Sequence, residues 1–185
     1  LNKPRGVVTT RRDPEGRPTV YAMLDDDATR LIPIGRLDLA STGLLMMTSD
    51  TELAAWLTDP ANQVPRVYVV TVRGEVTAEE GASMERGVGL GRERLAAASV
   101  VVRKASGRES HLVVELREGK NREVRRLCEA FGHPVTRLKR VSFGPLQLGD
   151  LAPGAWREVT RDEIARAFPT APGVSSAPKG PRKNN

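Results

Sequence analysis

The chain has 185 residues, of which 39% are hydrophobic and 28% are charged, a composition typical of an ordinary globular protein. No apolar run approaches membrane-spanning length and the N-terminus lacks the pattern of a signal peptide, so we expect a soluble, cytoplasmic protein without a membrane partner. A single cysteine, Cys128, and two histidines far apart in sequence, His111 and His133, exclude a disulfide framework and argue against a metal site.

The net charge of +6 and the sequence pI near 10.0 predict a polyanionic partner, most simply a nucleic acid. The basic residues of the body gather in two groups, at 117–126 and at 137–140, and a further excess lies at the C-terminus. The alternative is a solvated surface with a basic bias and no particular partner.

The first sixty residues predict short elements joined by turns. Residues 7–10 are expected to form a strand and residues 13–16 a turn. The acidic stretch 25–27 is expected to be a solvated turn. Ser49 and Glu52 have the spacing of a capping box, which predicts the start of a short helix. Three apolar side chains of that helix should pack inward: Leu53, Trp56 and Leu57.

An isolated carboxylate, Asp38, stands two residues after Arg36, between the apolar segments 31–34 and 44–47. Residues 41–43 favour a turn, so two short buried strands are expected to meet beside this carboxylate. A charge at such a place is costly to desolvate unless it is paired or used in chemistry. The alternative is a turn aspartate that caps its own backbone.

From residue 66 onward the sequence alternates between strand and helix patterns. Six elements are predicted, namely strands at 66–72, 97–103, 110–117 and 135–141 and helices at 78–86 and 121–131. Their order, β-α-β-β-α-β, is typical of a ferredoxin-like arrangement. The glycine-rich run 87–91 lacks a preceding strand and a following helix, so we expect a loop and not a nucleotide-binding turn.

The predicted helix at 121–131 is amphipathic. A stripe with the spacing i, i+3, i+4, i+7 is expected to be buried, and it consists of Val124, Leu127, Cys128 and Phe131. Cys128 is therefore expected to be a core residue and not a nucleophile. Arg122 and Arg126 lie on the opposite, solvent-facing side. Arg125 flanks the stripe, where it can pair with a half-buried carboxylate.

One domain is expected at 1–169, with subdomains at about 1–62 and 63–169. Residues 170–185 are rich in Pro, Gly, Ala, Ser and Lys, which predicts a disordered basic tail. Because the chain opens at Leu1 inside a predicted strand edge, it is expected to be a fragment of a longer protein.

Several stretches, taken in order, resemble one family. They are Leu1-Asn2-Lys3-Pro4-Arg5-Gly6, Gly35-Arg36-Leu37-Asp38, Thr48-Ser49-Asp50, Tyr68, Glu118-Gly119-Lys120-Asn121-Arg122-Glu123-Val124-Arg125-Arg126-Leu127 and Phe143-Gly144-Pro145-Leu146. Each motif is weak alone, but their order over residues 1–160 is specific. The chain resembles the catalytic domain of the RsuA/RluB family of ribosomal-RNA pseudouridine synthases, and residues 119–122 are most similar to the RluB branch.

The resemblance implies an isomerase that detaches uracil from its ribose in RNA, turns it and rejoins it through carbon, with no cofactor and no metal. It implies the pseudouridine synthase fold, an α+β fold with a mixed, mostly antiparallel central sheet flanked by helices. The implied partner is ribosomal RNA or a pre-ribosomal particle, with large-subunit 23S RNA favoured over small-subunit 16S RNA. Family members often carry an upstream S4-type RNA-binding domain, which is expected to be absent from this fragment. A monomer is expected.

The resemblance also implies roles for particular residues. Asp38 matches the catalytic nucleophile of the family. Arg36 matches the arginine that fills the gap left by the extruded base, and Tyr68 matches the tyrosine that packs on that base. Arg125 matches the basic residue that pairs with the aspartate. Five further residues are expected to contact RNA, namely Lys3, Lys120, Asn121, Arg122 and Arg126.

Two positions beside Asp38 depart from the family pattern. Ser41 stands where the family usually has a threonine, and it keeps the hydroxyl group. Ala40 replaces a residue that is more often polar, so this loop has one side chain fewer that can form hydrogen bonds.

Two other functions remain open from the residues themselves. A non-catalytic RNA-binding module that aids ribosome assembly would explain the basic groups equally well, but it does not require Asp38, Tyr68 or Arg125. A glycosidase-like hydrolase needs two carboxylates flanking the scissile bond, and the sequence offers one strong candidate. The uridine isomerase is therefore the favoured hypothesis.

Overall fold

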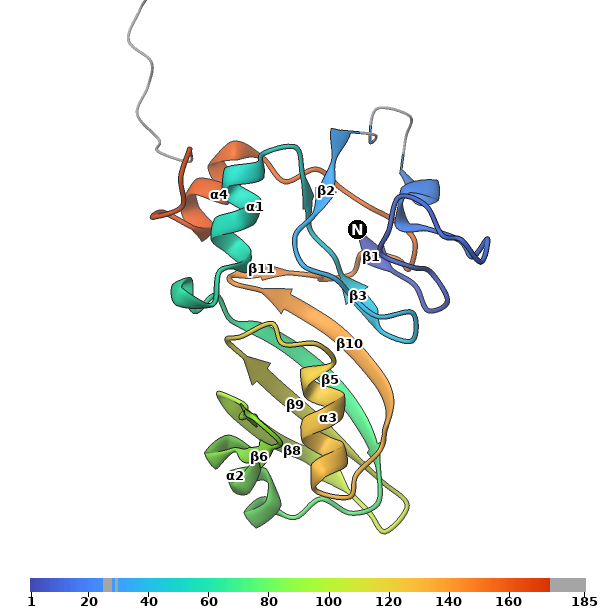
Figure 1. The fold of residues 1–185 in the computed structure, drawn as a ribbon, viewed down its shortest axis with the longest axis vertical. Helices are drawn as coiled ribbons and strands as arrows, with labels where there is room; N and C mark the ends of the chain where they lie inside the picture. Colours follow the sequence, from blue (N-terminus) through green and yellow to red (C-terminus); the bar gives the residue numbers. More distant parts are fainter. Residues whose placement is uncertain (25–27, 29, 174–185) are drawn as a thin grey trace, which may run out of the picture.

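One sheet extends through most of the protein, for which the computed structural model describes residues 1–24, 28 and 30–173. Its strands are β1 (Asn2–Lys3), β3 (Thr42–Leu44), β5 (Arg66–Arg73), β8 (Ser99–Ala105), β9 (Glu109–Leu116), β10 (Val135–Phe143) and β11 (Leu146–Gln147). They lie in the order β1-β3-β10-β5-β9-β8, with β11 beside β10 (Figure 1). All neighbours are antiparallel except β3 and β10, which are parallel.

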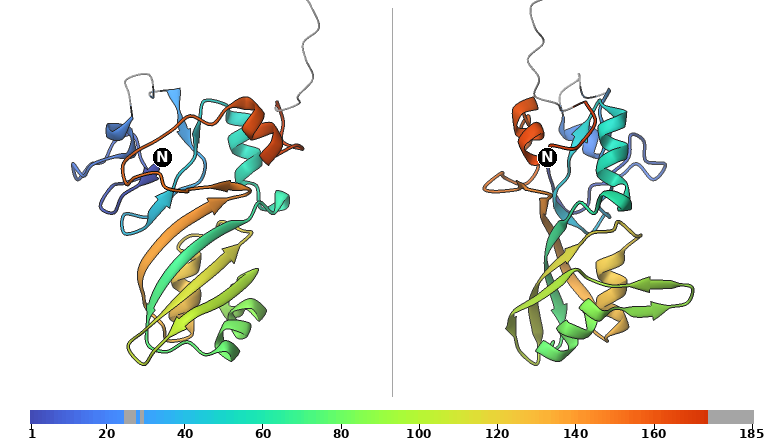
Figure 2. Two further views of the ribbon diagram at one scale, coloured as in Figure 1. Left: turned by 180° about the vertical axis from the view of Figure 1, so that it is seen from behind. Right: turned by 90° about the vertical axis from the view of Figure 1, so that its left-hand side faces the viewer.

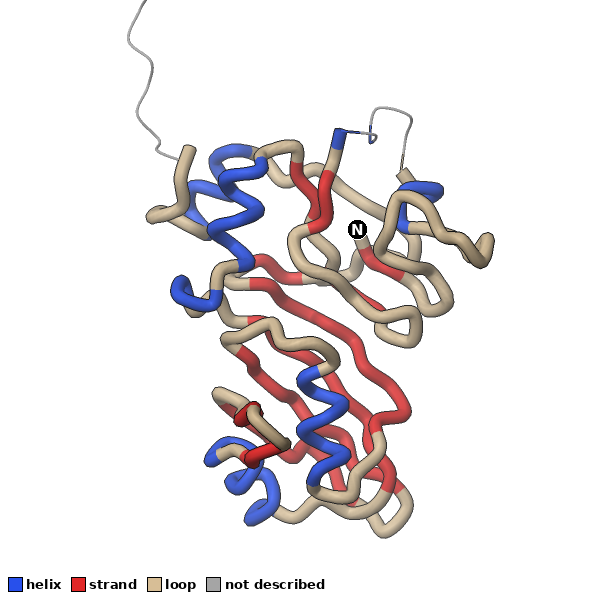
Figure 3. The backbone as a smooth tube through the Cα atoms, viewed as in Figure 1, coloured by secondary structure: helices blue, strands red, loops and turns tan. Residues whose placement is uncertain are grey.

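Helices and two small ribbons complete the described part of the fold. The helices are α1 (Thr51–Thr58), α2 (Ala78–Arg86), α3 (Glu123–Ala130), α4 (Arg161–Ala167) and the 3-10 turns η1 (Val20–Met23) and η3 (Pro60–Asn62). The ribbons are β2 (Ile32–Pro33) with β4 (Met47–Thr48) and β6 (Val88–Leu90) with β7 (Glu93–Leu95). Much of the first half is loop and turn (Figure 3). None of the described helices has the length and apolar character needed to cross a membrane.

The second half has the predicted ferredoxin-like arrangement. Strand, helix, strand, strand, helix and strand succeed one another as β5, α2, β8, β9, α3 and β10, and the spatial order β10-β5-β9-β8 places the last strand beside the first. Both helices cover the same face of the sheet, where Met84 of α2 and Leu127 of α3 are buried against the strand residues Val70 and Leu112. The expected α+β class with a mostly antiparallel sheet is therefore confirmed.

The amphipathic stripe of α3 is also confirmed. Val124, Leu127 and Cys128 are buried and Phe131 packs against the same core. Burial raises the pKa of the Cys128 thiol to about 12, in agreement with the expectation that it is a core residue and not a nucleophile.

Residues 7–10 do not form the predicted strand. Val8 makes one isolated parallel bridge to Thr19, and the remaining backbone follows a loop. Val7 is buried and the Thr9 hydroxyl donates to the carbonyl of Leu37. The β-branched side chains therefore anchor a loop, because no long strand lies beside them to complete a ladder.

Two further local predictions are wrong. The short helix predicted after Ser49 is present as α1, but it is capped by Asp50 and not by Ser49, since the Asp50 carboxylate accepts hydrogen bonds from the backbone N–H groups of Glu52 and Leu53. The glycine-rich run 87–91 contributes β6, so this segment is half of a hairpin that extends past α3 (Figure 2). By contrast, the turn at 13–16 is confirmed, with Gly16 N–H donating to the Asp13 carbonyl.

Two segments with predicted structure lie wholly or mostly outside the described residues. The acidic stretch 25–27 lies outside the described residues, as does most of the predicted tail, 174–185. Residues 170–173 of that tail are described, and Ala171 packs with Phe168 in the core around α1. The packed part of the domain therefore continues a few residues past 169.

The two halves of the protein are joined where β3 runs parallel to β10. Gly43 of β3 lies opposite Arg140 of β10 and has a φ of +103°. A Cβ atom at this position would lie 2.2 Å from the Arg140 carbonyl oxygen, which is closer than real Cβ contacts. Glycine is thus required both by the backbone conformation and by the close approach of the strands.

We expect Gly43→Ala to lower the free energy of unfolding by about 3 kcal/mol, because the added methyl group strains the backbone and separates β3 from β10. Gly107→Ala is the matched control, since nothing lies within 4 Å of its would-be Cβ, and it should change stability by less than about 0.5 kcal/mol. Urea unfolding measures both values. Equal stabilities for the two variants would contradict the requirement for glycine at this junction.

Candidate active site

Asp38 lies in a loop in which one buried side chain stands between two more exposed side chains. Leu37 is buried with the core residues of the first half, whereas Arg36 on one side is exposed and Asp38 on the other is half-buried. Thr9 holds Leu37 by hydrogen bonds on both its carbonyl and its N–H group. The backbone N–H of Ser41 donates to the Asp38 carbonyl, which closes the turn. The loop therefore fixes Asp38 by its neighbours and leaves the carboxylate free for other contacts.

Two arginines from the start of α3 reach the same carboxylate oxygen of Asp38. The Arg122 Nη1 atom lies 3.3 Å from Asp38 Oδ2, and the Arg125 Nε atom lies 3.8 Å from it. The Arg122 side chain is 52% exposed, while that of Arg125 is 11% exposed. The predicted Asp38–Arg125 pairing is therefore present in the structure, but Arg122 makes the shorter contact.

Arg125 is held at several points. Its Nη1 atom donates to the Val135 carbonyl and its Nη2 atom to the Ser41 hydroxyl, at 3.2 and 3.3 Å. Burial lowers the pKa of Arg125, the positive charge of Arg122 lowers it further, and the attraction of Asp38 opposes both. Ser41, the residue that departs from the family pattern, thus contributes its hydroxyl to the positioning of Arg125.

Arg122 reaches Asp38 because of an unusual backbone conformation. It precedes α3 in the left-handed region, with a φ of 48°, and it makes no side-chain capping hydrogen bond. A non-glycine residue in this region carries a modest conformational cost. Helical periodicity puts Arg122 on the solvent-facing side of the predicted helix, so its contact with Asp38 was not predicted.

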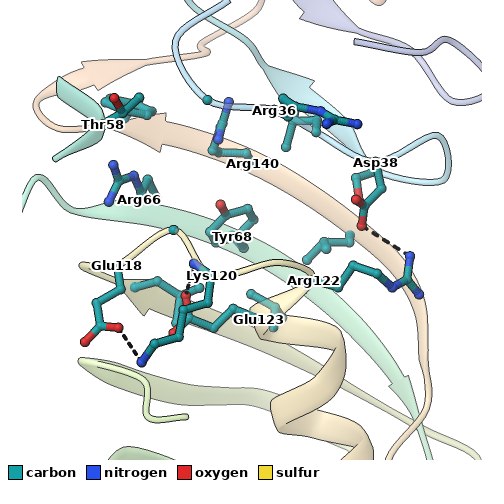
Figure 4. Close-up of a pocket in the computed structure, with 18 residues that line it drawn as sticks. Arg36, Asp38, Thr58, Arg66, Tyr68, Glu118, Lys120, Arg122, Glu123 and Arg140 are labelled. Atoms are coloured by element: carbon teal, nitrogen blue, oxygen red, sulfur yellow. Dashed lines mark hydrogen bonds and ion pairs between the residues drawn. The ribbon is translucent and has the colours of Figure 1, made fainter. Parts of the chain in front are cut away.

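Tyr68 lies in the same pocket as Asp38. It stands on β5 opposite Val114 of β9 and Arg140 of β10, where the cores of the two halves meet. The pocket has a volume of about 150 Å³. In Figure 4, Asp38 and Arg122 lie at one end of its lining and Arg66 and Thr58 at the other, with Tyr68 between them. Arg36 also lines the pocket, so three of the four predicted substrate-contacting and catalytic residues face one cavity.

Three buried charged residues of this pocket were not predicted as site residues, namely Arg66, Glu123 and Arg140. Burial is the main cause that raises the pKa of Glu123, whose carboxylate accepts a hydrogen bond from the Lys120 N–H group. For Arg140 a signal was available, because it alternates with Leu138 along a predicted strand and therefore shares its inward face.

Lys3 is not available to RNA, which corrects its predicted role. The residue is 0% exposed, and its ammonium group donates to the carbonyls of Val7 and Pro4 at 2.7 and 3.0 Å. Burial lowers the pKa of Lys3 to about 8, and the negative charge of Asp38 opposes this shift. Lys3 therefore holds the first loop together beneath the Asp38 segment.

The other residues predicted to contact RNA lie around the start of α3. Lys120 lines the pocket, forms an ion pair with Glu118 and donates to the Arg94 carbonyl. Arg126 forms an ion pair with Glu93, and Asn121 is exposed. Through Arg94, Lys120 ties the loop before α3 to the hairpin of β6 and β7, and through Glu93, Arg126 ties α3 itself to the same hairpin. Within the described residues no group of three or more His, Cys, Asp or Glu side chains is placed to hold a metal ion.

Comparison with known proteins identifies the class to which this fold and site belong. Residues 1–130 match the family described as RNA pseudouridylate synthase. A solved structure described as a pseudouridylate synthase superimposes with a TM-score of 0.78 at 29% identity, covering 90% of this chain and 71% of that one. The chain belongs to the RNA pseudouridylate synthase family, which confirms the predicted resemblance and the isomerase class.

Three individual relatives show how much sequence this chain shares with proteins of the family. An uncharacterized RNA pseudouridine synthase of Aquifex aeolicus is 37% identical over 180 residues, covering 97% of this chain and 72% of the relative. The ribosomal large subunit pseudouridine synthase B of Pseudomonas aeruginosa is 48% identical over 170 residues, covering 88% of this chain and 43% of the relative. The relative from Bacillus subtilis with the same name is 37% identical over 168 residues, covering 90% of this chain and 69% of the relative. The chain thus spans less than half of the Pseudomonas protein.

Lys3→Met tests the cost of burying the ammonium group. The folded-state pKa of Lys3 is about 8, below the ordinary value of 10.5, so the unfolded chain binds more protons between these values. The stability of the wild type should therefore rise relative to Lys3→Met, by on the order of 2 kcal/mol, as the pH increases from about 8 to about 10. Denaturant unfolding at a series of pH values measures the difference. A stability difference that does not change with pH would contradict a buried Lys3 with a lowered pKa.

Proposed function

We propose that this protein converts a uridine of ribosomal RNA into pseudouridine, with Asp38 as the nucleophile. The observation that carries the proposal is the position of Asp38, which lies half-buried at a pocket shared with Tyr68 and is contacted by two arginines. A non-catalytic RNA-binding surface has no need of a carboxylate in this setting, because a negative charge repels the RNA backbone.

The geometry supports different roles for Arg36, Tyr68 and Asp38 in the reaction. The target nucleotide must leave its stack before the bond between base and ribose can be reached. Arg36 is exposed at the pocket, and the described residues offer its guanidinium no hydrogen-bond or ion-pair partner, so it can enter the vacated stack. Tyr68 offers a ring against which the extruded uracil can pack.

Asp38 then supplies the carboxylate that forms a transient covalent bond to the nucleotide. Arg125, anchored by Val135 and Ser41, orients this carboxylate from the buried side. The bond between the uracil nitrogen and the ribose breaks, the uracil turns, and a ring carbon bonds to the same ribose. The bond to Asp38 breaks again, the carbon gives up its proton and the nitrogen takes one up, so no atom is gained from or lost to a second substrate. The residues named here act by binding, orienting and attacking, and we propose that no metal or cofactor takes part.

The substrate that we propose is large-subunit ribosomal RNA, free or in a pre-ribosomal particle. The support comes from the relatives that are named as ribosomal large subunit pseudouridine synthases, several of which are 37–48% identical to this chain. We propose that the protein works in the cytoplasm as a monomer. Small-subunit RNA is the alternative substrate.

Asp38→Asn should reduce pseudouridine formation by more than about a thousandfold, because the amide cannot act as the nucleophile. Pseudouridine mapping of ribosomal RNA from cells that lack the protein, rescued with wild type or with Asp38→Asn, measures the loss and identifies the site. Asp150→Asn, which changes an exposed aspartate outside the pocket, is the control. An Asp38→Asn protein that restores the modification would contradict the proposal.

Arg122 and Arg126 should differ in their contributions to RNA affinity. Arg122→Gln removes an exposed charge and should reduce the slope of log K against log salt concentration by about 1. Arg126→Gln should have a smaller effect, because Arg126 is less exposed than Arg122, forms a closer ion pair and lies outside the pocket. Arg161→Gln, at the start of α4, is the control outside the pocket. Unchanged affinity in both Arg122→Gln and Arg126→Gln would show that RNA approaches another face.

A further inference from the structure

Two buried arginines line the pocket near Tyr68. Arg66 at the start of β5 is 4% exposed and Arg140 on β10 is 3% exposed. Both guanidinium groups lie over the ring of Phe143, at 4.9 and 5.3 Å from its centroid. Both residues line the pocket together with Tyr68 (Figure 4). Two positive charges are therefore brought together in a place that is shielded from water.

The described residues provide neither arginine with an ion-pair partner, since no carboxylate oxygen lies within 4.0 Å of either guanidinium. Arg66 donates to the carbonyls of Arg117 and Leu57. Arg140 donates from Nε to the Leu44 carbonyl, but its Nη2 atom is buried without any hydrogen-bond partner. Burial of a charge is costly unless the charge is paired, and an unmade hydrogen bond adds to the cost.

The surrounding residues do not neutralise the positive charges of Arg66 and Arg140. Burial lowers the pKa of Arg66, Tyr68 opposes this shift, and the positive charge of Arg140 lowers the pKa further. Glu123 attracts Arg66 electrostatically, although it too is buried and its pKa is raised. The face of Phe143 contributes a weak attraction to both cations. One carboxylate and one aromatic ring therefore compensate only part of the two positive charges of Arg66 and Arg140. The site lacks a further anion.

We propose that Arg66 and Arg140 form a binding subsite for a phosphate group of the RNA, and that this subsite fixes the nucleotide whose base lies between Tyr68 and Asp38. The proposal rests on the proposed function, which makes RNA the source of the phosphate. Guanidinium groups match the geometry of phosphate oxygens, and charge-assisted hydrogen bonds to them are stronger than neutral ones. The binding energy is gained at a distance from the reacting carboxylate.

This subsite has a consequence for what the pocket accepts. A nucleoside without its phosphate would leave the two arginines uncompensated, whereas a nucleotide in an RNA chain would neutralise them. The pocket should therefore discriminate against free uridine, because a site built to bind a charged group rejects the analogue that lacks it. Arg66 and Arg140 are positioning residues in this account, since they hold the substrate without touching the reacting bond.

Calorimetric titration with three probes tests the proposal at constant ionic strength: uridine, uridine 5′-monophosphate and inorganic phosphate. We expect the wild type to bind the monophosphate at least about tenfold more tightly than uridine. Arg140→Gln and Arg66→Gln should abolish this preference, and Arg140→Lys should keep part of it. Arg137→Gln, an exposed arginine on the same strand but outside this pocket, should keep all of it.

Several results would overturn the proposal: equal wild-type affinities for uridine and its monophosphate, no response to any probe, or a preference that persists in Arg140→Gln. Inorganic phosphate that binds as tightly as the nucleotide would also overturn it, by identifying a free-phosphate site. If Arg140→Gln does not fold, the wild-type preference and the Arg140→Lys variant decide the question. The titration involves no turnover and can be repeated in Asp38→Asn, so a protein that prefers the monophosphate but forms no pseudouridine would contradict the proposed function alone.

Discussion

The parallel contact between β3 and β10 is the constraint on which the candidate site depends. Asp38 belongs to the first half of the chain, whereas the arginines that contact it lie at the start of α3, more than eighty residues later. Two of the seven sheet strands, β3 and β10, carry the junction between these halves. Because Gly43 lets the two strands approach closely, the Asp38 loop comes within reach of Arg122 and Arg125. The site is thus created by tertiary packing and not by either half alone.

Buried charge is the second feature that organises this region. Lys3, Arg66, Glu123 and Arg140 are each less than 5% exposed, although such residues are rarely buried without a partner. Lys3 satisfies its ammonium with two backbone carbonyls, and Arg66 does the same with its guanidinium. Carbonyl oxygens accept the hydrogen bonds of these cationic groups, but they neutralise only part of a full positive charge. The structure therefore bears an electrostatic cost around the pocket, and such costs are typical of regions that bind or transform a ligand.

The sequence predicted best what depends on neighbours along the chain. The strand alternation from residue 66 and the stripe of α3 are local patterns, and both were confirmed together with the ferredoxin-like order. Residues 7–10 had the composition of a strand but lacked a long partner strand, and partners are determined by the fold. The hairpin of β6 and β7 was hidden by glycines that disfavour strands in isolation. The burial of Lys3 and the contact of Arg122 with Asp38 could not be predicted, because one depends on packing and the other on a left-handed backbone conformation.

The two arginines beside Asp38 differ in a way that suits a site that must open to a nucleotide. Arg125 is held by Val135 and Ser41 and is largely buried, so moving it would break several contacts at once. Arg122 is half-exposed and, within the described residues, its guanidinium hydrogen-bonds to Asp38. An exposed ion pair of this kind contributes little to stability. In the proposed reaction, Arg122 can therefore leave Asp38 for an RNA phosphate at small cost while Arg125 stays in place, so that the carboxylate keeps its orientation as the substrate enters.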